Sequence, residues 1–228
     1  MAFDEVNDAP IEWAEGGNNN VEDHVHIGYN ILSKLREGYE PNSPVKIGRD
    51  VHIRAGTVIY AGCEIGNNVH IGHNVVLREF TKIGDNSSIG SGVVCEGYTR
   101  IGHHTTIHAQ THLTAKMNIG NYVFIGPKVT TMNDKRIRYY RPDIKDSEDC
   151  GATICDGVAI GGGAVILPHI FIQFGVIIGA GSVVTKDCKA FHVYIGVPAK
   201  EVRFMQKEEV VTYLREMYDE VLEVMTRR

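Results

Sequence analysis

Residues 45–80 read VKIGRDVHIRAGTVIYAGCEIGNNVHIGHNVVLREF, and an aliphatic residue returns in them at every sixth position. This ladder starts at Ile47 and continues without an insertion to Thr131, with Ile or Leu at thirteen of fifteen positions. A second, usually smaller residue lies two positions before each ladder residue. Because alternate residues of a strand point to the same face, each hexad directs two side chains inward. The ladder breaks after Thr131 and resumes from Ile154 to Val184.

A period of six fits neither an α-helix nor a plain strand, whose apolar residues recur at 3.6 and at 2. Short strands separated by a corner every six residues do fit, and three of them close a triangular coil. Fifteen hexads before the break and six after it predict about seven coils. The sequence therefore predicts an all-β parallel helix in the shape of a triangular prism.

The composition agrees with this prediction. Ile occurs 24 times and Val 25 times, but Leu only 7 times. Side chains branched at Cβ favour strands, so a helical bundle or a coiled coil is excluded. The net charge of −5 argues against broad binding of nucleic acid. Five cysteines without a CxxC pair indicate neither a disulfide framework nor a zinc knuckle.

No targeting signal is evident in the sequence. The first residues, MAFDEVNDAP, lack the basic and apolar regions of a secretory signal. The most apolar stretch, 164–184, contains Pro168, His169 and Gln173, which disfavour a membrane span. We therefore expect a cytoplasmic protein that binds neither membranes nor nucleic acid.

Three regions follow from the repeat. Residues 1–44 form an N-terminal segment, expected to be a loop or cap up to residue 24, with a stray hexad at 25–28 and an insertion at 31–44. Residues 45–200 form the β-helix, from which a loop at 133–150 protrudes. Residues 201–228 are expected to form a C-terminal helix that caps the prism, because apolar residues recur there at helical spacing: Val210, Leu214, Met217, Val221 and Met225.

The residue after each ladder position occupies a corner of the prism, and the three corners differ in composition. The first corner is uniformly glycine: Gly48, Gly66, Gly84, Gly102 and Gly120. The second corner mixes glycine with Arg54 and His108. The third corner has no glycine and carries Tyr60, Arg78, Glu96, Thr114 and Met132, with Glu79 next to Arg78. Functional residues are expected where a repeat departs from its own pattern, so the third corner is the predicted functional edge.

The loop at 133–150 leaves the repeat at this same edge. A loop that the repeat does not need is usually kept for binding. Its three arginines, Arg136, Arg138 and Arg141, are candidates to hold phosphate groups, since a guanidinium matches phosphate oxygens in a bidentate manner. A solvated loop balanced by its own acidic residues is the alternative.

Residues 45–200 resemble the hexapeptide-repeat acyltransferases, whose fold is a left-handed parallel β-helix. The segment VFIGPKVTTMND, residues 123–134, is similar to the one that precedes the loop in acyltransferases acting on nucleotide-linked amino sugars. Relatives that acetylate free sugars or antibiotics carry a histidine base at the position of Asn133 and Asp134. The resemblance implies an acetyl-CoA-dependent N-acetyltransferase without a metal, assembled as a homotrimer with active sites between subunits.

The resemblance also implies residue roles. Asn133 would hold or polarise the amine, and the proton would leave through Asp134, a water or the substrate itself. His108 and Glu79 are alternative bases. Substrate-binding candidates are Arg54, Tyr60, Arg78, Glu96, Arg136, Arg138 and Arg141. Acetyl-CoA would lie along Gly162 and Ala180, with its phosphates at Lys186, Lys200 and Arg203.

Three other functions stay open. An O-acetyltransferase would keep the fold and change the acceptor. His103 and His108 reproduce a spacing of β-helical carbonic anhydrases, but the positions one and two coils before His103 hold Asp85 and Asn67 in place of a third histidine. A non-catalytic scaffold would not explain the third corner beside an arginine-rich loop.

Overall fold

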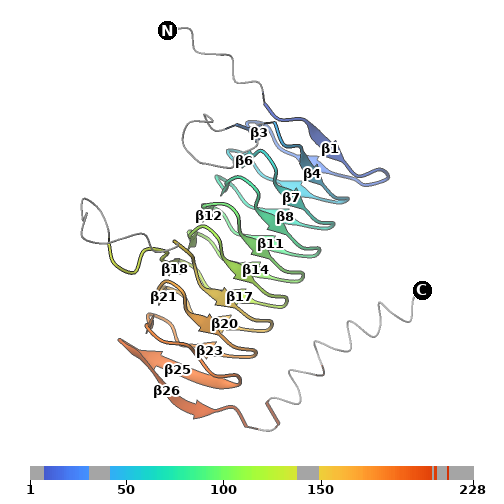
Figure 1. Cartoon of the computed structure of the whole chain (residues 1–228). Coiled ribbons are helices and arrows are strands. Elements are labelled where there is room, and N and C mark those ends of the chain that lie inside the picture. Colours follow the sequence, from blue (N-terminus) through green and yellow to red (C-terminus); the bar gives the residue numbers. More distant parts are fainter. Residues whose placement is uncertain (1–7, 31–41, 138–148, 207, 210–214, 216–228) are drawn as a thin grey trace.

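The computed structural model describes residues 8–30, 42–137, 149–206, 208–209 and 215. Within these residues the chain winds into a stack of three-sided coils (Figure 1). Each side of the stack is one sheet, and neighbouring strands are parallel except for the last pair. The prediction of a parallel β-helix is confirmed.

The three sheets have the following strands. Sheet A contains β1 (Ile11–Trp13), β4 (Val45–Ile47), β7 (Glu64–Ile65), β10 (Lys82–Ile83), β13 (Arg100–Ile101), β16 (Asn118–Ile119), β19 (Thr153–Ile154) and β22 (Phe171–Ile172). Sheet B contains β2 (Asn20–Val21), β5 (His52–Ile53), β8 (His70–Ile71), β11 (Ser88–Ile89), β14 (Thr106–Ile107), β17 (Phe124–Ile125), β20 (Ala159–Ile160), β23 (Ile177–Ile178), β25 (His192–Gly196) and β26 (Ala199–Phe204). Sheet C contains β3 (His26–Tyr29), β6 (Val58–Tyr60), β9 (Val76–Leu77), β12 (Val94–Cys95), β15 (His112–Leu113), β18 (Thr130–Thr131), β21 (Val165–Ile166) and β24 (Val183–Val184).

The ladder residues stack on one another inside the prism. Ile65, Ile83 and Ile101 pair in register along sheet A, 18 residues apart, and each is nearly inaccessible to solvent. The loop interrupts the sequence but not the stack, because Ile119 pairs with Ile154 on the next coil. Close stacking of branched side chains at every rung explains the excess of Ile and Val over Leu.

Buried hydroxyl groups occupy many of the smaller inward positions. The Thr105 hydroxyl donates to the carbonyl of Gly120 on the next coil at 2.9 Å, and the Ser87 hydroxyl donates to that of Gly102 at 2.8 Å. These bonds satisfy corner carbonyls that the strands leave without a partner, so the polar side chains fit an otherwise apolar core.

The N-terminal segment differs from expectation. Strands β1, β2 and β3 pair in parallel with β4, β5 and β6, so residues 11–29 form a complete first coil and the described residues make eight coils, not seven. Trp13 and Val21 take the ladder positions opposite Ile47 and Ile53, but eight residues separate them. Both remain about 40% exposed, since no coil precedes them: Trp13 is 43% and Val21 38% exposed.

The C-terminal end also differs. Strand β26 runs through the predicted boundary at 200/201 and pairs antiparallel with β25, so a hairpin ends sheet B. Residues 208–209 and 215 are helical, and the rest of the predicted C-terminal helix lies outside the described residues. Among the described residues no helix is long and apolar enough to cross a membrane.

Candidate active site

The corner that follows sheet A is structural. Its glycines lie against the backbone of the next coil: a Cβ on Gly84 would come within 2.7 Å of the Gly102 carbonyl carbon. The uniform glycine at this corner is therefore a steric requirement. The contrast between this corner and the third one therefore has a steric cause and does not by itself mark the third corner as functional.

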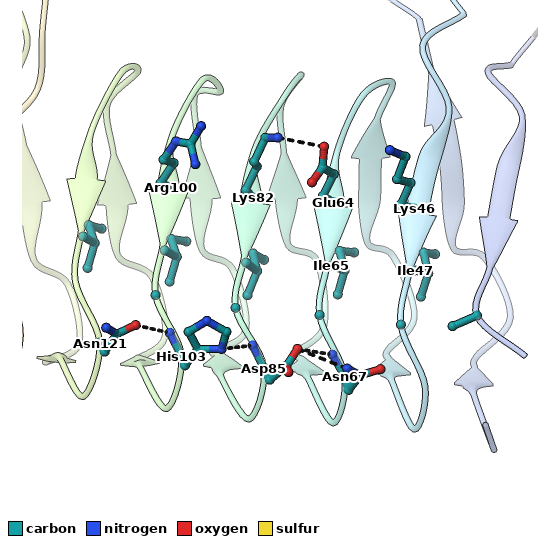
Figure 2. A pocket seen from close by; sticks show the side chains of 18 of the residues that line it. Lys46, Ile47, Glu64, Ile65, Asn67, Lys82, Asp85, Arg100, His103 and Asn121 are labelled. Atoms are coloured by element: carbon teal, nitrogen blue, oxygen red, sulfur yellow. Dashed lines mark hydrogen bonds and ion pairs between the residues drawn. The ribbon is translucent and has the colours of Figure 1, made fainter. Parts of the chain in front are cut away.

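A series of hydrogen-bonded side chains, one from each coil, lies beside these glycines (Figure 2). Each member accepts a bond from the backbone N–H of the preceding member: Asp85 accepts from Asn67 at 2.7 Å, His103 from Asp85 at 3.0 Å, and Asn121 from His103 at 2.8 Å. His103 accepts through Nδ1, so this nitrogen is already occupied. Within the described part of the chain no three His, Cys, Asp or Glu side chains are grouped to hold a metal ion.

Sheet A also carries a shallow groove of about 830 Å³. Its outer row alternates in charge through Lys46, Glu64 and Lys82, and the Lys82 ammonium lies 2.7 Å from the Glu64 carboxylate (Figure 2). Arg100 follows in the same row. The exposed Lys82–Glu64 pair contributes little stability, and the charged row leaves the face hydrophilic.

The corner that follows sheet C has a different conformation. Its first residue points outward and its second residue turns into the prism, as shown by buried Ala61, Gly97 and Ala115. At the other two corners the second residue is at least partly exposed. The corner after sheet C therefore admits large first residues such as Tyr60 and Arg78.

Tyr60 and Arg78 stack at this corner. The Arg78 guanidinium carbon lies 5.5 Å from the centre of the Tyr60 ring, and the Tyr29 ring lies 4.9 Å from it on the other side. Partial burial raises the pKa of the Tyr60 phenol, an effect that Arg78 partly offsets. Tyr60 therefore remains a neutral donor at physiological pH. Both residues are half-buried at the predicted edge.

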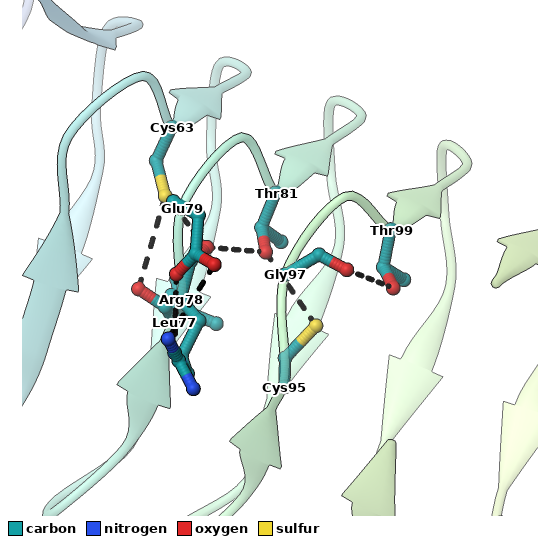
Figure 3. Close-up of polar contacts among 8 residues, drawn as sticks. All are labelled: Cys63, Leu77, Arg78, Glu79, Thr81, Cys95, Gly97 and Thr99. Carbon is teal, nitrogen blue, oxygen red and sulfur yellow. Dashed lines mark hydrogen bonds and ion pairs between the residues drawn. The ribbon is translucent and has the colours of Figure 1, made fainter. Parts of the chain in front are cut away.

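Glu79 occupies the inward position and is fully buried (Figure 3). Its carboxylate accepts bonds from Arg78 Nε at 3.1 Å and from Nη2 at 3.4 Å. The Arg78 carbonyl in turn accepts from the Cys63 thiol at 3.3 Å and the Thr81 hydroxyl at 2.7 Å. Glu79 therefore anchors Arg78, and its burial argues against the predicted role as a base.

Glu96 faces a histidine that sequence reasoning missed. Its carboxylate lies 3.3 Å from Nε2 of His112, and both side chains are about one-third to two-fifths exposed (33% and 40%). His112 is the outward residue of β15, where the neighbouring strands β9 and β12 carry Val76 and Val94. The corner residues alone do not reveal His112, because its departure from the repeat lies at a strand position.

The remaining first residues of this corner differ in exposure. Thr114 is buried, and its hydroxyl lies 3.1 Å from that of Thr131, so this residue has a structural role. Met132 is 39% exposed where the chain enters the loop.

Asn133 and Asp134 begin the loop and are half-buried. Asp134 Oδ1 accepts the backbone N–H groups of Arg136 and Ile137, each at 2.9 Å, and so shapes the turn. Asn133 follows Met132 in the same column of positions as Glu79, and its amide makes no hydrogen bond to the described residues. Arg136 is exposed beside it, and Arg138 and Arg141 lie outside the described residues.

Other predicted residues lie on the opposite edge of sheet C, at the corner that follows sheet B. Arg54 is there, 3.2 Å from the Glu22 carboxylate. His108 is exposed, with its ring 5.0 Å from that of Phe124. One subunit therefore places the predicted residues on two separate edges and does not bring His108 to Asn133.

The small residues predicted to receive acetyl-CoA lie on this second edge. The Gly162 carbonyl accepts a hydrogen bond from the N–H of Gly181 at 2.9 Å. This bond shows that Gly162 and Ala180 lie one above the other on successive coils. Gly163 and Gly181 have φ of +69° and +68° and open space where a Cβ would be. The corner is thus a bare backbone cradle that a flexible, amide-containing chain fits.

The predicted phosphate ligands are unequal. Lys186 and Lys200 are exposed. Arg203 donates two bonds to Glu209, at 2.7 and 3.0 Å, and these bonds lower the pKa of Glu209 to about 2. Arg203 therefore already has a carboxylate partner, but both groups are exposed and such a pair is weak, so its predicted role stays a prediction.

Comparison with known proteins agrees with this description. The family model described as bacterial transferase hexapeptide (six repeats) matches residues 44–79 and 62–97. A UDP-N-acetylglucosamine acyltransferase from Campylobacter jejuni shares the fold, with a TM-score of 0.60 and 17% identity over 90% of this chain and 79% of that one. The chain therefore has the left-handed β-helix fold.

Two curated relatives share parts of the sequence. A dTDP-4-amino-4,6-dideoxy-D-glucose acyltransferase of Escherichia coli is 45% identical over 51 residues, 22% of this chain and 27% of the relative. A galactoside O-acetyltransferase of Lactococcus lactis is 33% identical over 98 residues, 42% of this chain and 46% of the relative. The matches thus span less than half the length of either relative.

Proposed function

Since this chain is a hexapeptide-repeat protein with the left-handed β-helix fold, we propose that it is an acetyl-CoA-dependent N-acetyltransferase. The acceptor is the amino group of a nucleotide-linked amino sugar. The observation that carries the proposal is the polar column of Tyr60, Arg78 and Glu96 at the same edge of sheet C as Asn133 and the loop, which follow two coils after Glu96. A repeat built for stability alone has no need of such a column.

The choice of an amino sugar has two supports. The residues before the loop, VFIGPKVTTMND, resemble those of acyltransferases for nucleotide-linked amino sugars. The E. coli relative is named for an amino sugar carried on dTDP. Arg136 is exposed at the start of the loop, and a guanidinium can pair with phosphate oxygens through two parallel hydrogen bonds.

We further propose that the protein acts as a homotrimer in the cytoplasm. The predicted residues lie on both edges of sheet C, so a site that needs both edges requires a neighbouring subunit. The outer row of sheet C is mostly apolar, with Val at five strands: Val58, Val76, Val94, Val165 and Val183. The outer row of sheet A is charged, so sheet C is the side we assign to the interface.

In this proposal Asn133 orients the acceptor amine and the backbone cradle at Gly162 and Ala180 receives the pantetheine arm. Acetyl-CoA supplies the thioester. Alignment of amine and thioester is expected to give the largest part of the rate increase. Cytoplasmic thiols keep the five cysteines reduced, in agreement with their free state here.

The test is an acceptor panel in which release of free thiol from acetyl-CoA is followed. The panel pairs dTDP- and UDP-linked amino sugars with the matching sugars that carry a hydroxyl in place of the amine. Transfer to an amine alone supports the proposal. Transfer to the hydroxyl alone would favour the alternative function, an O-acetyltransferase. The L. lactis relative is named for that activity. Absence of transfer to every acceptor would contradict both.

A further inference from the structure

The outer row of sheet C contains a histidine, His112, that the roles proposed above leave unused, and Glu96 of the polar column lies beside it. From β6 to β18 the outward residues are Val58, Val76, Val94, His112 and Thr130. His112 thus stands among apolar neighbours at the coil just before Asn133. Glu96 reaches it from the corner of the preceding coil, at 3.3 Å.

Other histidines also lie near carboxylates, but they lie farther from the loop: His26 is in the same outer row of sheet C, at the first coil. His26 contacts Asp8 and His73 contacts Glu22, both around the first coils of the prism. His192 lies 3.6 Å from Glu201 in the terminal hairpin. In the described residues, only His112 combines a carboxylate partner with a position one coil from the loop.

The pair has the arrangement of a base and its positioning group. The negative Glu96 carboxylate lies 3.3 Å from Nε2, so its charge favours the tautomer that carries the proton on that nitrogen. Nδ1 then keeps its lone pair and has no hydrogen-bond partner among the described residues.

We propose that His112 is the general base of the transfer and that Glu96 is its positioning residue; this inference rests on the proposed function. The neutral amine attacks the thioester carbonyl, and its nitrogen forms a bond to the acetyl carbon. Nδ1 of His112 accepts the proton that the nitrogen loses. The C–S bond breaks, the thiolate takes that proton, and the ring returns to its neutral state.

The proposal explains how the amine loses its proton although Asn133 is not basic. It also assigns the role that was given to His108 and Glu79. His108 lies on the other edge of sheet C, and Glu79 is buried beneath Arg78. Packing of sheet C against a neighbouring subunit would shield His112 from bulk water, which favours proton transfer to the bound acceptor.

The test measures kcat and KM for His112→Gln, Glu96→Gln and a control, His70→Gln, with the amino sugar that the wild type accepts best. His70 is exposed on sheet B, on a strand several coils from the coils that hold Gly162 and Asn133. We expect His112→Gln to lower kcat by about 10²- to 10⁴-fold with little change in KM, the usual loss for a general base. Glu96→Gln should lower kcat about tenfold, Glu96→Asp less, and His70→Gln should match the wild type.

The pH profile separates a base from a packing residue. The kcat of the wild type should rise with pH, and the His112→Gln variant should lack this dependence. Glu96 is the charged group that faces the His112 ring, and the uncharged Val94 and Thr130 flank it on the neighbouring strands. A His112→Gln variant with wild-type kcat, in an enzyme that does acetylate amines, would overturn this inference and leave the proposed function intact. A wild type that acetylates nothing in the panel would overturn both. Unchanged thermal unfolding and oligomeric mass of each variant show that it is folded.

Discussion

At the scale of single residues, the corner amides of the coil depend on side chains from the next coil. His103 is one of these side chains, because its Nδ1 accepts the Asp85 N–H at 3.0 Å. Asn121 does the same for His103 at 2.8 Å. A histidine that suggested a metal site from its spacing is thus equivalent to an asparagine one coil away.

This equivalence predicts the effect of two substitutions. His103→Asn should keep the bond to Asp85 and leave stability within about 0.5 kcal/mol of the wild type. His103→Leu removes the acceptor and should cost about 1 kcal/mol, because water replaces the bond only in part at this exposed corner. Denaturant unfolding of both variants measures the difference. Equal destabilisation by Asn and Leu would contradict the role of the Nδ1 acceptor.

Three of the five cysteines are buried in the prism: Cys63, Cys95 and Cys188. Burial raises the pKa of Cys63 and Cys188 to about 12, and that of Cys95 in the same direction. The folded state therefore keeps these groups as thiols, while the unfolded chain ionises near pH 9. Stability from this source is present below pH 9 and decreases as the pH rises toward 12.

The same burial predicts selective alkylation. At pH 8 a brief pulse of iodoacetamide should modify Cys150 and Cys155, which are partly exposed, well before the other three. Mass spectrometry of the peptides measures the extent at each site, and an unfolded sample in urea serves as the control. Rapid modification of Cys63 in the folded protein would show that the coil opens around it.

At the scale of elements, the three corners of each coil have distinct conformations. A Cβ on Gly84 would approach the Gly102 carbonyl carbon to 2.7 Å and the His103 nitrogen to the same distance. Both contacts are with backbone atoms, which cannot rotate away. At Gly181, by contrast, φ is +68° and no atom lies within 4 Å of the Cβ position.

Two substitutions at these corners should therefore differ. Gly84→Ala should destabilise the prism by about 1–3 kcal/mol, the usual cost of overpacking. Gly181→Asn should be tolerated, since Asn adopts the left-handed region more readily than most residues and the space is open. Thermal unfolding of the two variants provides the comparison. A Gly84→Ala variant as stable as the wild type would show that neighbouring coils separate easily.

The period of six predicted the sheets and their register because every rung imposes the same packing on its ladder residue. The first coil escaped prediction because Trp13 and Val21 are eight residues apart and neither is Ile. The burial of Glu79 could not be predicted from residue type, because a charged residue is expected to face solvent. Its column, Ala61, Gly97 and Ala115, is made of small residues, and that pattern could have indicated an inward position.

At the scale of the whole molecule, the three faces of the prism differ in polarity. Sheet A exposes Lys46, Glu64, Lys82 and Arg100 along its outer row. Sheet C exposes valine on most of its strands, and these valines lie side by side from β6 to β12. Association of subunits through sheet C would remove this apolar surface from water, which is favourable by about 25 cal/mol per Å².

A charge placed on sheet C should therefore break the assembly. Val76→Glu puts a carboxylate between Val58 and Val94, where an interface would desolvate it at a cost of several kcal/mol. The control Asn118→Glu adds the same charge to sheet A beside Arg100 and should leave the assembly intact. Because one chain has a mass of 25.2 kDa, sedimentation should give about 76 kDa for the wild type and the control.

The Val76→Glu variant should sediment near the mass of a single chain and lose acetyl transfer, because the edge with Asn133 and the edge with Gly162 would no longer meet across subunits. Its circular dichroism should stay that of a β-helix, since Val76 points out of the prism and the stacked ladder residues are untouched. A variant that stays trimeric would assign the interface to another face. A monomer that retains full turnover would show that each prism holds a complete site.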